Sequence, residues 1–590
     1  MANKRVAILG GGIGGLTAAH ELLERGYKVD LYEKEPIFGG KARSYEKTGQ
    51  KGGILNLPTE HGFHMLAGFY KHLPDTMKRI PIAGQANGVL DNLVDTKITL
   101  IATKGTDPLV KAPNRLRSLE DLRAAVKALL KTNRFDIPLP DRLFLVGRLL
   151  AVLMACDERR YDQLENVDWW DFIQAANRSL DYQRFFAIGP TRTMVACKAD
   201  KISARTGGVI GLQLAMGSIS GTTDRILNGP TNEVLINPWV EFLKRFPDFK
   251  KHRRKVTALT YSERNNEIKF QYEDSGASHE IAADYYVCAL PVEVVEGLLK
   301  DFQAKNPKDF GALVKQEEKF GTLDRLTVAR MNGIQFYLKK DVKINPGHII
   351  HIDSPWGLTS ISEQQFWSRS YTSPISGILS VDISDWDTPC DHKEHAPRIA
   401  RQMSSAADIA DEVWLQLKDS INSHGFADQL DDRNLADWIL DNDVVVISKS
   451  QIPSVFTLGS AQNSDLEPLL INVNGSWQYR PNADTNVDNL VLAADYVRTY
   501  SDIATMEGAN EAARRAVNAL LDRDGSSEKR CDIFPLEEPP IFKPFRDLDA
   551  LNYRSSYSPF GSKRGTLQEY LSTFESISTL PQALRTALGL

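Results

Sequence analysis

The first 35 residues alternate short apolar runs with one amphipathic stretch. Residues 5–10 (RVAILG) form a β-rich apolar run, and residues 27–32 (YKVDLY) form a second one. Between them, residues 16–25 repeat apolar positions at helical spacing, so that Leu16 and Leu22 share one side. Gly26 follows and ends the helix. The pattern predicts a strand, a helix and a second strand.

A glycine-rich turn joins the first strand to the helix. The fingerprint G-x-G-x-x-G is matched by Gly10, Gly12 and Gly15. Gly14 lies within it, and Glu33 follows at the end of the second strand. The glycines permit a tight bend, a close backbone approach to pyrophosphate and close packing of the helix on the sheet. These residues predict a dinucleotide-binding site. The carboxylate of Glu33 would accept a hydrogen bond from a ribose hydroxyl, and it would disfavour the 2′-phosphate of NADP. The alternative is a glycine-rich turn without a ligand.

The residues after the acid separate FAD from NAD. Residues 38–44 read FGGKARS. The order of fingerprint, acid and Gly-Gly-Arg/Lys resembles the flavin amine oxidase and carotenoid desaturase superfamily, where this last segment wraps the FAD pyrophosphate. The resemblance implies FAD as the cofactor, with Gly40 and Lys41 as contacts. Lys34 and Arg43 are assigned to the same site; the alternative is a plain turn with exposed basic residues.

A second part of the cofactor site is expected near the C-terminus. Residues 488–496 (DNLVLAADY) read as a turn, a buried strand and an acid at its tip, and a helix-forming segment follows. The block resembles that of carotenoid desaturases, with Asp495 and Met506 in the matching places. Amine oxidases usually have Glu in place of Asp495, so the match favours desaturases. Ala494 replaces the usual glycine, which a negative φ permits. The alternative is an ordinary C-terminal helix.

A small β-layer is expected to complete the cofactor domain. Residues 255–259, 268–272 and 284–291 are strand-like runs, the last ending in Ala-Leu-Pro. They resemble the β-meander of the same family, in which the valine at the position of Val256 presents its backbone to the adenine. The resemblance therefore implies that three distant stretches of chain hold one FAD.

The reactive part of the site rests on one histidine. Residues 60–64 (EHGFH) resemble a Glu-x-Gly-x-His segment that lies close to the isoalloxazine in the family, which makes His64 the candidate catalytic residue. The alternative is a hydrogen-bonded core histidine. In many amine oxidases a lysine near the start of a substrate-domain strand holds a water at the flavin. Here residues 330–333 read RMNG, which weakens an assignment to amine oxidation.

Two further stretches bear on the substrate side. Residues 118–130 form an amphipathic helical pattern that opens with a capping box, and residues 143–156 (LFLVGRLLAVLMAC) are almost wholly apolar. The second stretch is too short to span a bilayer. It is either a core helix or an apolar entrance at a membrane surface. Trp356, Trp367 and Trp477 are candidates for the pocket wall or for core packing.

No metal site is predicted. His348 and His351 are three residues apart, so on a strand they point to opposite faces. A CxHxxH pattern that begins at Cys390 is interpreted as surface. The sequence contains no nucleophile-elbow, P-loop or HExxH motif.

Composition removes further classes of function. The chain has 590 residues, and 71 Lys+Arg against 76 Asp+Glu give a net charge of -5, which offers no bulk attraction for nucleic acid. Five scattered cysteines fit a reducing compartment. There is no signal-peptide pattern and no apolar run of about 20 residues. We expect a cytoplasmic protein, with peripheral contact at a membrane surface as the open alternative.

These patterns predict an α/β fold in which a Rossmann-type FAD-binding domain is interleaved with an α+β substrate-binding domain. The expected boundaries are 1–100, 231–300 and 471–524 for the FAD-binding domain, 101–230 (with a helical insertion) and 301–470 for the substrate domain, and 525–590 for a C-terminal extension. Carotenoid desaturases normally lack such an extension, which would clamp the body, mediate oligomerisation, dock a partner or rest on a membrane.

The resemblance implies an FAD-dependent oxidoreductase. It would desaturate a largely apolar carotenoid-, terpenoid- or lipid-like substrate by hydride transfer from C–H to flavin N5, and pass the electrons to a quinone or O2. Three alternatives remain open at this point: an oxidase acting on the C–N bond of an amine or cyclic imine, a redox-neutral double-bond isomerase, and a non-catalytic flavoprotein.

Overall fold

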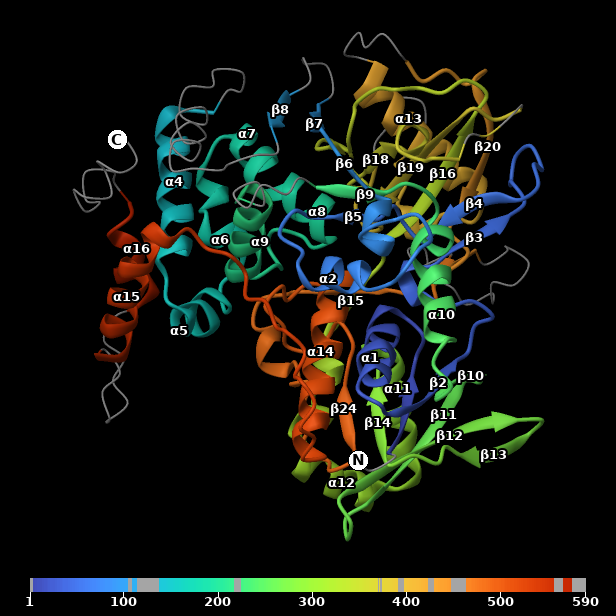
Figure 1. The fold of residues 1–590 in the computed structure, drawn as a ribbon. Coiled ribbons are helices and arrows are strands. Elements are labelled where there is room, and N and C mark those ends of the chain that lie inside the picture. The colour runs from blue at the N-terminus through green and yellow to red at the C-terminus, as the bar shows by residue number, and fades with distance from the viewer. Residues whose placement is uncertain are drawn as a thin grey trace, which may run out of the picture.

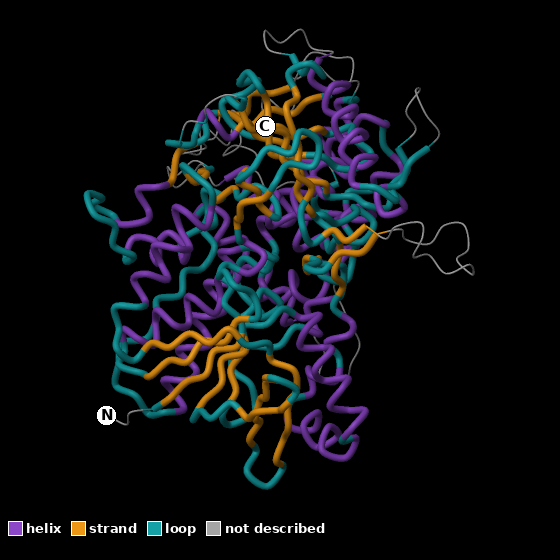
Figure 2. The backbone as a smooth tube through the Cα atoms, turned by 90° about the vertical axis from the view of Figure 1, so that its right-hand side faces the viewer, coloured by secondary structure: helices purple, strands orange, loops and turns teal. Residues whose placement is uncertain are grey.

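Two sheets stand at opposite ends of the molecule, with a layer of helices beside them (Figure 1). A computed structural model describes residues 4–103, 109–113, 137–216, 224–369, 371, 374–390, 397–422, 429–446, 463–555 and 566–575. The view in Figure 2 shows helices flanking the lower sheet, which lies near the N-terminus. The predicted helix over residues 118–130 and the histidines of the pattern after Cys390 lie outside the described residues.

The lower sheet has five parallel strands in the order β10-β2-β1-β14-β24. They are β1 (Arg5–Leu9), β2 (Lys28–Glu33), β10 (Phe249–Arg253), β14 (Tyr285–Cys288) and β24 (Leu490–Leu492). Helices α1 (Ile13–Glu24) and α14 (Met506–Arg523) pack together on it, and Asn510 of α14 donates to Thr17 of α1. The predicted strand, helix and strand at the N-terminus are confirmed. One sheet therefore joins the beginning, middle and end of the chain.

A separate antiparallel sheet contains β11 (Val256–Ser262), β12 (Glu267–Asp274) and β13 (Ala277–Glu280). The prediction that residues 284–291 form the third strand of this layer is wrong, because β14 pairs in parallel with β1 and β24. The apolar run of β14 is suited to a strand that helices cover on both faces. The third strand of the layer is β13, whose four residues are exposed and carry no apolar signal.

The upper sheet has seven strands in the order β20-β16-β19-β18-β17-β7-β8. They are β7 (Ile98–Ala102), β8 (Leu109–Pro113), β16 (Asn332–Leu338), β17 (Ile349–His351), β18 (Thr359–Ser362), β19 (Gly377–Ile383) and β20 (Leu435–Leu440). All pairs are antiparallel except β17 with β7. Side chains of α13 (Ala406–Ile421) pack with one face of this sheet in a common hydrophobic core, which also buries Trp356.

The apolar segment 143–156 lies in the helical layer beside the sheets. It forms most of α4 (Leu139–Met154), whose side chains are mostly buried and pack with those of α6 (Trp169–Phe172) and α9 (Ala204–Met216). The core-helix interpretation is therefore confirmed, and the alternative of a membrane-facing entrance at this segment is wrong. None of the helices that the structure describes combines the length and the apolarity that a bilayer crossing requires.

The C-terminal extension lies against this helical layer through α15 (Lys543–Ser555) and α16 (Leu567–Ser572) (Figure 1). Asp549 of α15 receives the guanidinium of Arg159 at 2.8 Å and the backbone N–H of Cys156 at 2.9 Å. The hydroxyl of Tyr570 donates to the carbonyl of Ala151, and the ring of Tyr570 lies 4.1 Å from the Arg159 guanidinium. The extension thus forms a clamp over the end of α4 and the residues that follow it.

Removing the buried carboxylate should loosen this clamp. In Asp549→Ala the guanidinium of Arg159, which is about 95% buried, loses its ion-pair partner, and breaking such a pair costs about 3–5 kcal/mol. The matched control is Asp547→Ala on the same helix, whose exposed pair with Lys543 contributes about 0.5 kcal/mol or less. Urea denaturation of the full chain measures both; equal midpoints for the two variants would contradict the clamp.

Candidate active site

A cavity of about 930 Å³ extends from the glycine-rich turn to the upper sheet. Gly10–Gly14 line one end, and Thr99, Ile350 and Thr359 of the upper sheet line the other. Its lining includes twelve predicted site residues: Gly10, Gly12, Gly14, Glu33, Lys34, Gly40, Lys41, Arg43, His64, Val256, Asp495 and Met506. The remaining predicted residue, Gly15, lies outside the lining. The fold thus brings together positions that are up to 496 residues apart (506 − 10).

The glycines of the turn have different steric roles. A Cβ on Gly15 would lie 1.9 Å from the carbonyl oxygen of Gly10, and a Cβ on Gly14 would lie 2.0 Å from that of Ala493, so both positions permit close packing of α1. A Cβ on Gly12 meets nothing nearer than 3.6 Å and would occupy the cavity itself. Gly12 therefore leaves open the cradle that a pyrophosphate needs beside the N-terminus of α1.

Glu33, the acid at the end of β2, lines the cavity beside this cradle. One carboxylate oxygen accepts from the N–H of Gly11 at 2.7 Å, and the other accepts from Glu35 at 2.8 Å. Burial raises the pKa of Glu33, and the two N–H donors oppose that increase. Val256 lines the same part of the cavity. The residues present therefore fit a ribose and an adenine.

The basic residues after the turn are paired with acids, and the side chains of Lys41 and Arg43 are also largely buried. Lys41 Nζ lies 2.9 Å from Glu293, and Lys34 Nζ lies 3.0 Å from Glu467. Arg43 Nη2 lies 2.7 Å from Asp443. The alternative of a plain turn with exposed basic residues does not fit Lys41 and Arg43, whereas Lys34 is exposed. The ion pairs fix the three side chains in position on the cavity wall.

The C-terminal part of the site follows β24. Asp495 and Met506 line the cavity, and Thr505 caps α14 by accepting from the N–H of Gly508 at 3.1 Å. Ala494 does not adopt a positive φ, so the chain tolerates alanine where relatives have glycine, as the sequence predicts. The N-terminus of α14 thereby faces the cavity, where its dipole favours negative charge.

Glu507, next to Met506, has a structural role that sequence reasoning missed. Its carboxylate accepts from the backbone N–H groups of Lys71, His72 and Leu73 at 2.8–2.9 Å and caps α2 (His72–Lys78). Burial acts to raise the pKa of Glu507, but His72 and these donors bring it below the ordinary value. His72 Nε2 in turn accepts from the N–H of Phe534 in the extension. Only the fold reveals these distant partners.

His64 lies between β4 (Leu57–Glu60) and β5 (Met65–Leu66), on the cavity wall. Its Nδ1 lies 3.3 Å from the carboxylate of Glu60 and 3.1 Å from the hydroxyl of Thr231. The Thr231 N–H donates to Glu60 at 2.7 Å. The ring is therefore held from one side while it remains part of the cavity surface.

Asp382 on β19 is a cavity residue that the sequence did not single out. It is 5% exposed, and it accepts from the N–H of Phe63 at 3.2 Å. Within the described part of the chain, no basic side chain lies within ion-pair distance of it. Burial raises the pKa of Asp382 to about 7, although His64 and His61 act to lower it. Glu363, buried nearby and outside the cavity lining, has a pKa raised well above its ordinary value, chiefly by burial.

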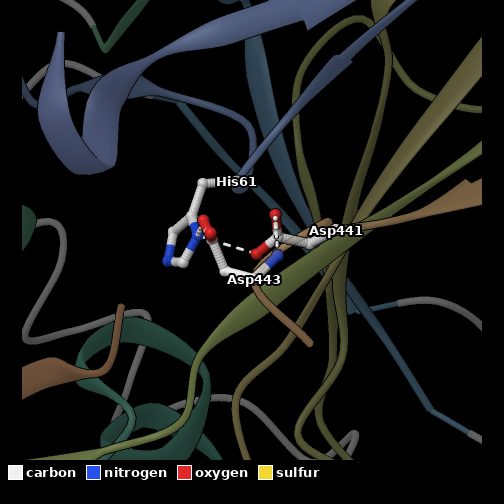
Figure 3. Close-up of side chains that lie close together, drawn as sticks. All are labelled: His61, Asp441 and Asp443. Atoms are coloured by element: carbon white, nitrogen blue, oxygen red, sulfur yellow. Dashed lines mark hydrogen bonds and ion pairs between the residues drawn. The ribbon is translucent and has the colours of Figure 1, made fainter. Parts of the chain in front are cut away.

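Figure 3 shows His61 beside Asp441 and Asp443. His61 Nδ1 lies 2.7 Å from Asp441 and 3.5 Å from Asp443. Burial acts to lower the pKa of His61, but the two carboxylates raise it to about 10. The three groups are close enough to hold a metal ion, yet His61 and Arg43 already balance both carboxylates. We interpret the cluster as an ion-pair network that supports the cavity wall.

The remaining histidines and tryptophans that the sequence singled out lie in the core, pack on other side chains or line the cavity. His348 lines the cavity, whereas His351 is hydrogen-bonded between Ser360 and Ser420 on the opposite side of the sheet, as the strand geometry predicts. Burial lowers the pKa of His348 to about 4, so it is neutral near pH 7. Trp367 packs in a small hydrophobic core, and Trp477 packs on Tyr161, outside the cavity lining.

Comparison with known proteins identifies the family. The model of the family described as flavin containing amine oxidoreductase matches residues 13–521. The chain belongs to this family. A 15-cis-phytoene desaturase of Synechococcus elongatus is 21% identical over 548 residues, which cover 90% of this chain and 99% of that protein. A zeta-carotene desaturase of Zea mays is 40% identical over 76 residues, 13% of this chain and 12% of that protein.

A solved structure supports the fold of this flavin-containing amine oxidoreductase. Cyclohexylamine oxidase from Brevibacterium oxydans has a TM-score of 0.54 at 13% identity, with 89% of this chain and 100% of that chain covered. The α/β fold with a Rossmann-type FAD-binding sheet is thus confirmed. The protein is a flavin-dependent oxidoreductase that binds FAD, and the glycine cradle and Glu33 fit that cofactor.

The described cavity lining of this oxidoreductase has no lysine away from the nucleotide-binding turn and Val256. The lining lysines are Lys34, Lys41 and Lys255, all beside the nucleotide-binding turn or Val256. Near the start of β16, Met331 faces the cavity, whereas Arg330 donates to Asn463. Residues 330–333 thus place no lysine at the start of β16.

Three glycine variants test the cofactor cradle. Gly12→Ala should fold normally but lose FAD affinity by about tenfold or more, because its methyl group would enter the pyrophosphate cradle. Gly15→Ala should fail to fold, since its Cβ would overlap a backbone carbonyl. Gly311→Ala, whose Cβ meets nothing within 4 Å, is the neutral control. Titration of the apo-protein with FAD measures the affinity, and circular dichroism measures whether each variant folds. If Gly12→Ala binds FAD with wild-type affinity, the assignment of this turn as the pyrophosphate cradle is wrong.

Proposed function

We propose that this flavoenzyme desaturates a largely apolar, carotenoid- or terpenoid-like substrate, with hydride transfer from C–H to flavin N5. The observation that carries the proposal is that the cofactor cavity, whose lining is mostly apolar as a whole, continues past the cofactor-binding end as a chamber beside the upper sheet. Beyond the cofactor-binding end, the lining includes the apolar residues Ile210 of α9, Ile350 of β17 and Leu470 of β23 (Leu469–Ile471), together with polar residues such as Thr99, Thr206 and Thr359. Such a chamber favours a long apolar molecule over a small polar one. The full-length similarity to a phytoene desaturase supports the same substrate class.

Each predicted cofactor residue has a proposed task. The Gly10–Gly15 turn and Gly40 admit the pyrophosphate, Glu33 accepts from the ribose, and Val256 presents its backbone to the adenine. Lys34, Lys41 and Arg43 shape the wall through their ion pairs. Asp495 and the N-terminus of α14 at Met506 hold the flavin end.

The chain's own residues would bind and shield the substrate. Bound FAD supplies the hydride acceptor. The apolar part of the lining would exclude water from the reacting carbons. His64, which Glu60 and Thr231 hold on the cavity wall, would lie beside those carbons. Electrons would leave to a quinone or O2.

Oxidation of a C–N bond is the second candidate function. It is favoured by one observation, the carboxylate of Asp382 on the cavity wall, which could bind the cation of an amine. The missing lysine near Met331 counts against it.

Anaerobic mixing separates these functions. Phytoene or zeta-carotene in detergent micelles should bleach the flavin absorbance of the holoenzyme, whereas a panel of primary amines should leave it unchanged. A fully saturated hydrocarbon of similar length is the control for detergent and binding effects. Bleaching by amines alone would favour the second candidate, and isomerised product with an unchanged flavin spectrum would indicate the isomerase.

A further inference from the structure

Asp382 occupies a central place on the substrate side of the cavity. It lies near the end of β19, paired in register with Gly333 of β16 and Thr359 of β18. Its side chain and that of Thr359 line the cavity, as do those of Thr99 and Ile350 on neighbouring strands. A substrate that lies between this sheet face and the flavin end therefore meets the carboxylate.

The groups around Asp382 leave this carboxylate available. The titratable neighbours are Glu60, His61 and His64 on the segment packed against β19, and Glu363 after β18. His61 is paired with Asp441 and Asp443, and His64 Nδ1 is engaged by Glu60 and Thr231. Among the described residues, Asp382 accepts one hydrogen bond, from the Phe63 N–H. Its second oxygen has no such donor among the described residues.

We propose that Asp382 is the base that accepts the substrate proton during desaturation; this inference rests on the proposed function. On one carbon, the C–H bond gives up its hydrogen with both electrons to the flavin. On the adjacent carbon, the C–H bond breaks, its electron pair forms the new C=C bond, and the proton moves to a carboxylate oxygen of Asp382. Two hydrogens and two electrons leave the substrate, and the flavin is the oxidant.

The local electrostatics suit this task. A general base works best when its pKa lies near the working pH, and burial raises the pKa of Asp382 to about 7. His64 acts to lower that pKa and so helps to keep the carboxylate ionised. We assign His64 a positioning role, because Glu60 and Thr231 hold its Nδ1.

The test compares Asp382→Asn with Glu363→Gln in FAD-loaded protein. The first variant keeps the size and the acceptor for the Phe63 N–H but cannot take the proton, so flavin reduction by phytoene or zeta-carotene should slow by about 10²–10⁴-fold. The second replaces a neighbouring buried carboxyl group outside the cavity lining, and its reduction rate and pH profile should match the wild type. Both variants should bind FAD normally.

A readout independent of turnover follows the proton itself. Infrared difference spectra of resting wild-type protein should show a carboxyl band that titrates near pH 7, remains in Glu363→Gln and is absent from Asp382→Asn. The wild-type reduction rate should rise with pH through the same midpoint, since the ionised carboxylate is the active form.

The possible outcomes are distinct. If the polyenes reduce the wild type and Asp382→Asn equally, with the same pH profile, Asp382 is not the base although the proposed function stands. If neither polyene reduces the wild type, the proposed function fails and the inference fails with it. If amines reduce the wild type and Asp382→Asn changes only their KM, the carboxylate is a cation anchor and the inference is overturned.

Discussion

The site depends on close packing between the first turn of α1 and the backbone at two strand ends. A Cβ on Gly15 would lie 1.9 Å from the Gly10 carbonyl, and a Cβ on Gly14 would lie 2.0 Å from the Ala493 carbonyl. The first contact holds the turn beneath the helix, and the second holds the residues that precede Asp495 against it. Gly14 and Gly15 therefore hold the glycine-rich turn and the residues that precede Asp495 in fixed positions relative to α1, because neither contact leaves room for a side chain.

Buried charges then tie the remaining layers to this centre. Glu507 caps α2 and contacts His72, which accepts from the N–H of Phe534. Arg205 of α9 lies 2.8 Å from Glu165 and also pairs with Asp502, near the start of α14. Removing one member of such a group leaves another charge buried without its partner, which is strongly unfavourable. The helical layer and the extension thus have defined positions relative to the cofactor.

The sequence was most informative where chemistry restricts residue type within a short span. The turn at Gly10, Gly12 and Gly15 and the acid Glu33 could be recognised because a dinucleotide needs them at fixed spacing. Segment 143–156 is compatible with two interpretations, because an apolar helix has the same sequence pattern whether protein or lipid covers it. The β14 run was placed in the wrong sheet, since its residues suit any buried strand.

The rest of the site could not be predicted because its partners come from distant parts of the chain. Asp382 stands alone in an apolar strand, and only the fold places it opposite residues 60–64. The docking of Asp549 on Arg159 spans 390 residues and leaves no local pattern. The cofactor-binding motifs are local in sequence, so they can be recognised there. The substrate-side wall of the cavity is assembled from several distant strands, so it cannot.

We infer that one chain encloses one FAD in a cavity built from the beginning, middle and end of its sequence. The most direct measurement is to denature the purified protein and quantify the released chromophore by chromatography against the protein concentration. We predict one FAD for each chain. Protein that releases no flavin, and whose apo-form takes up none from added FAD, would contradict the account.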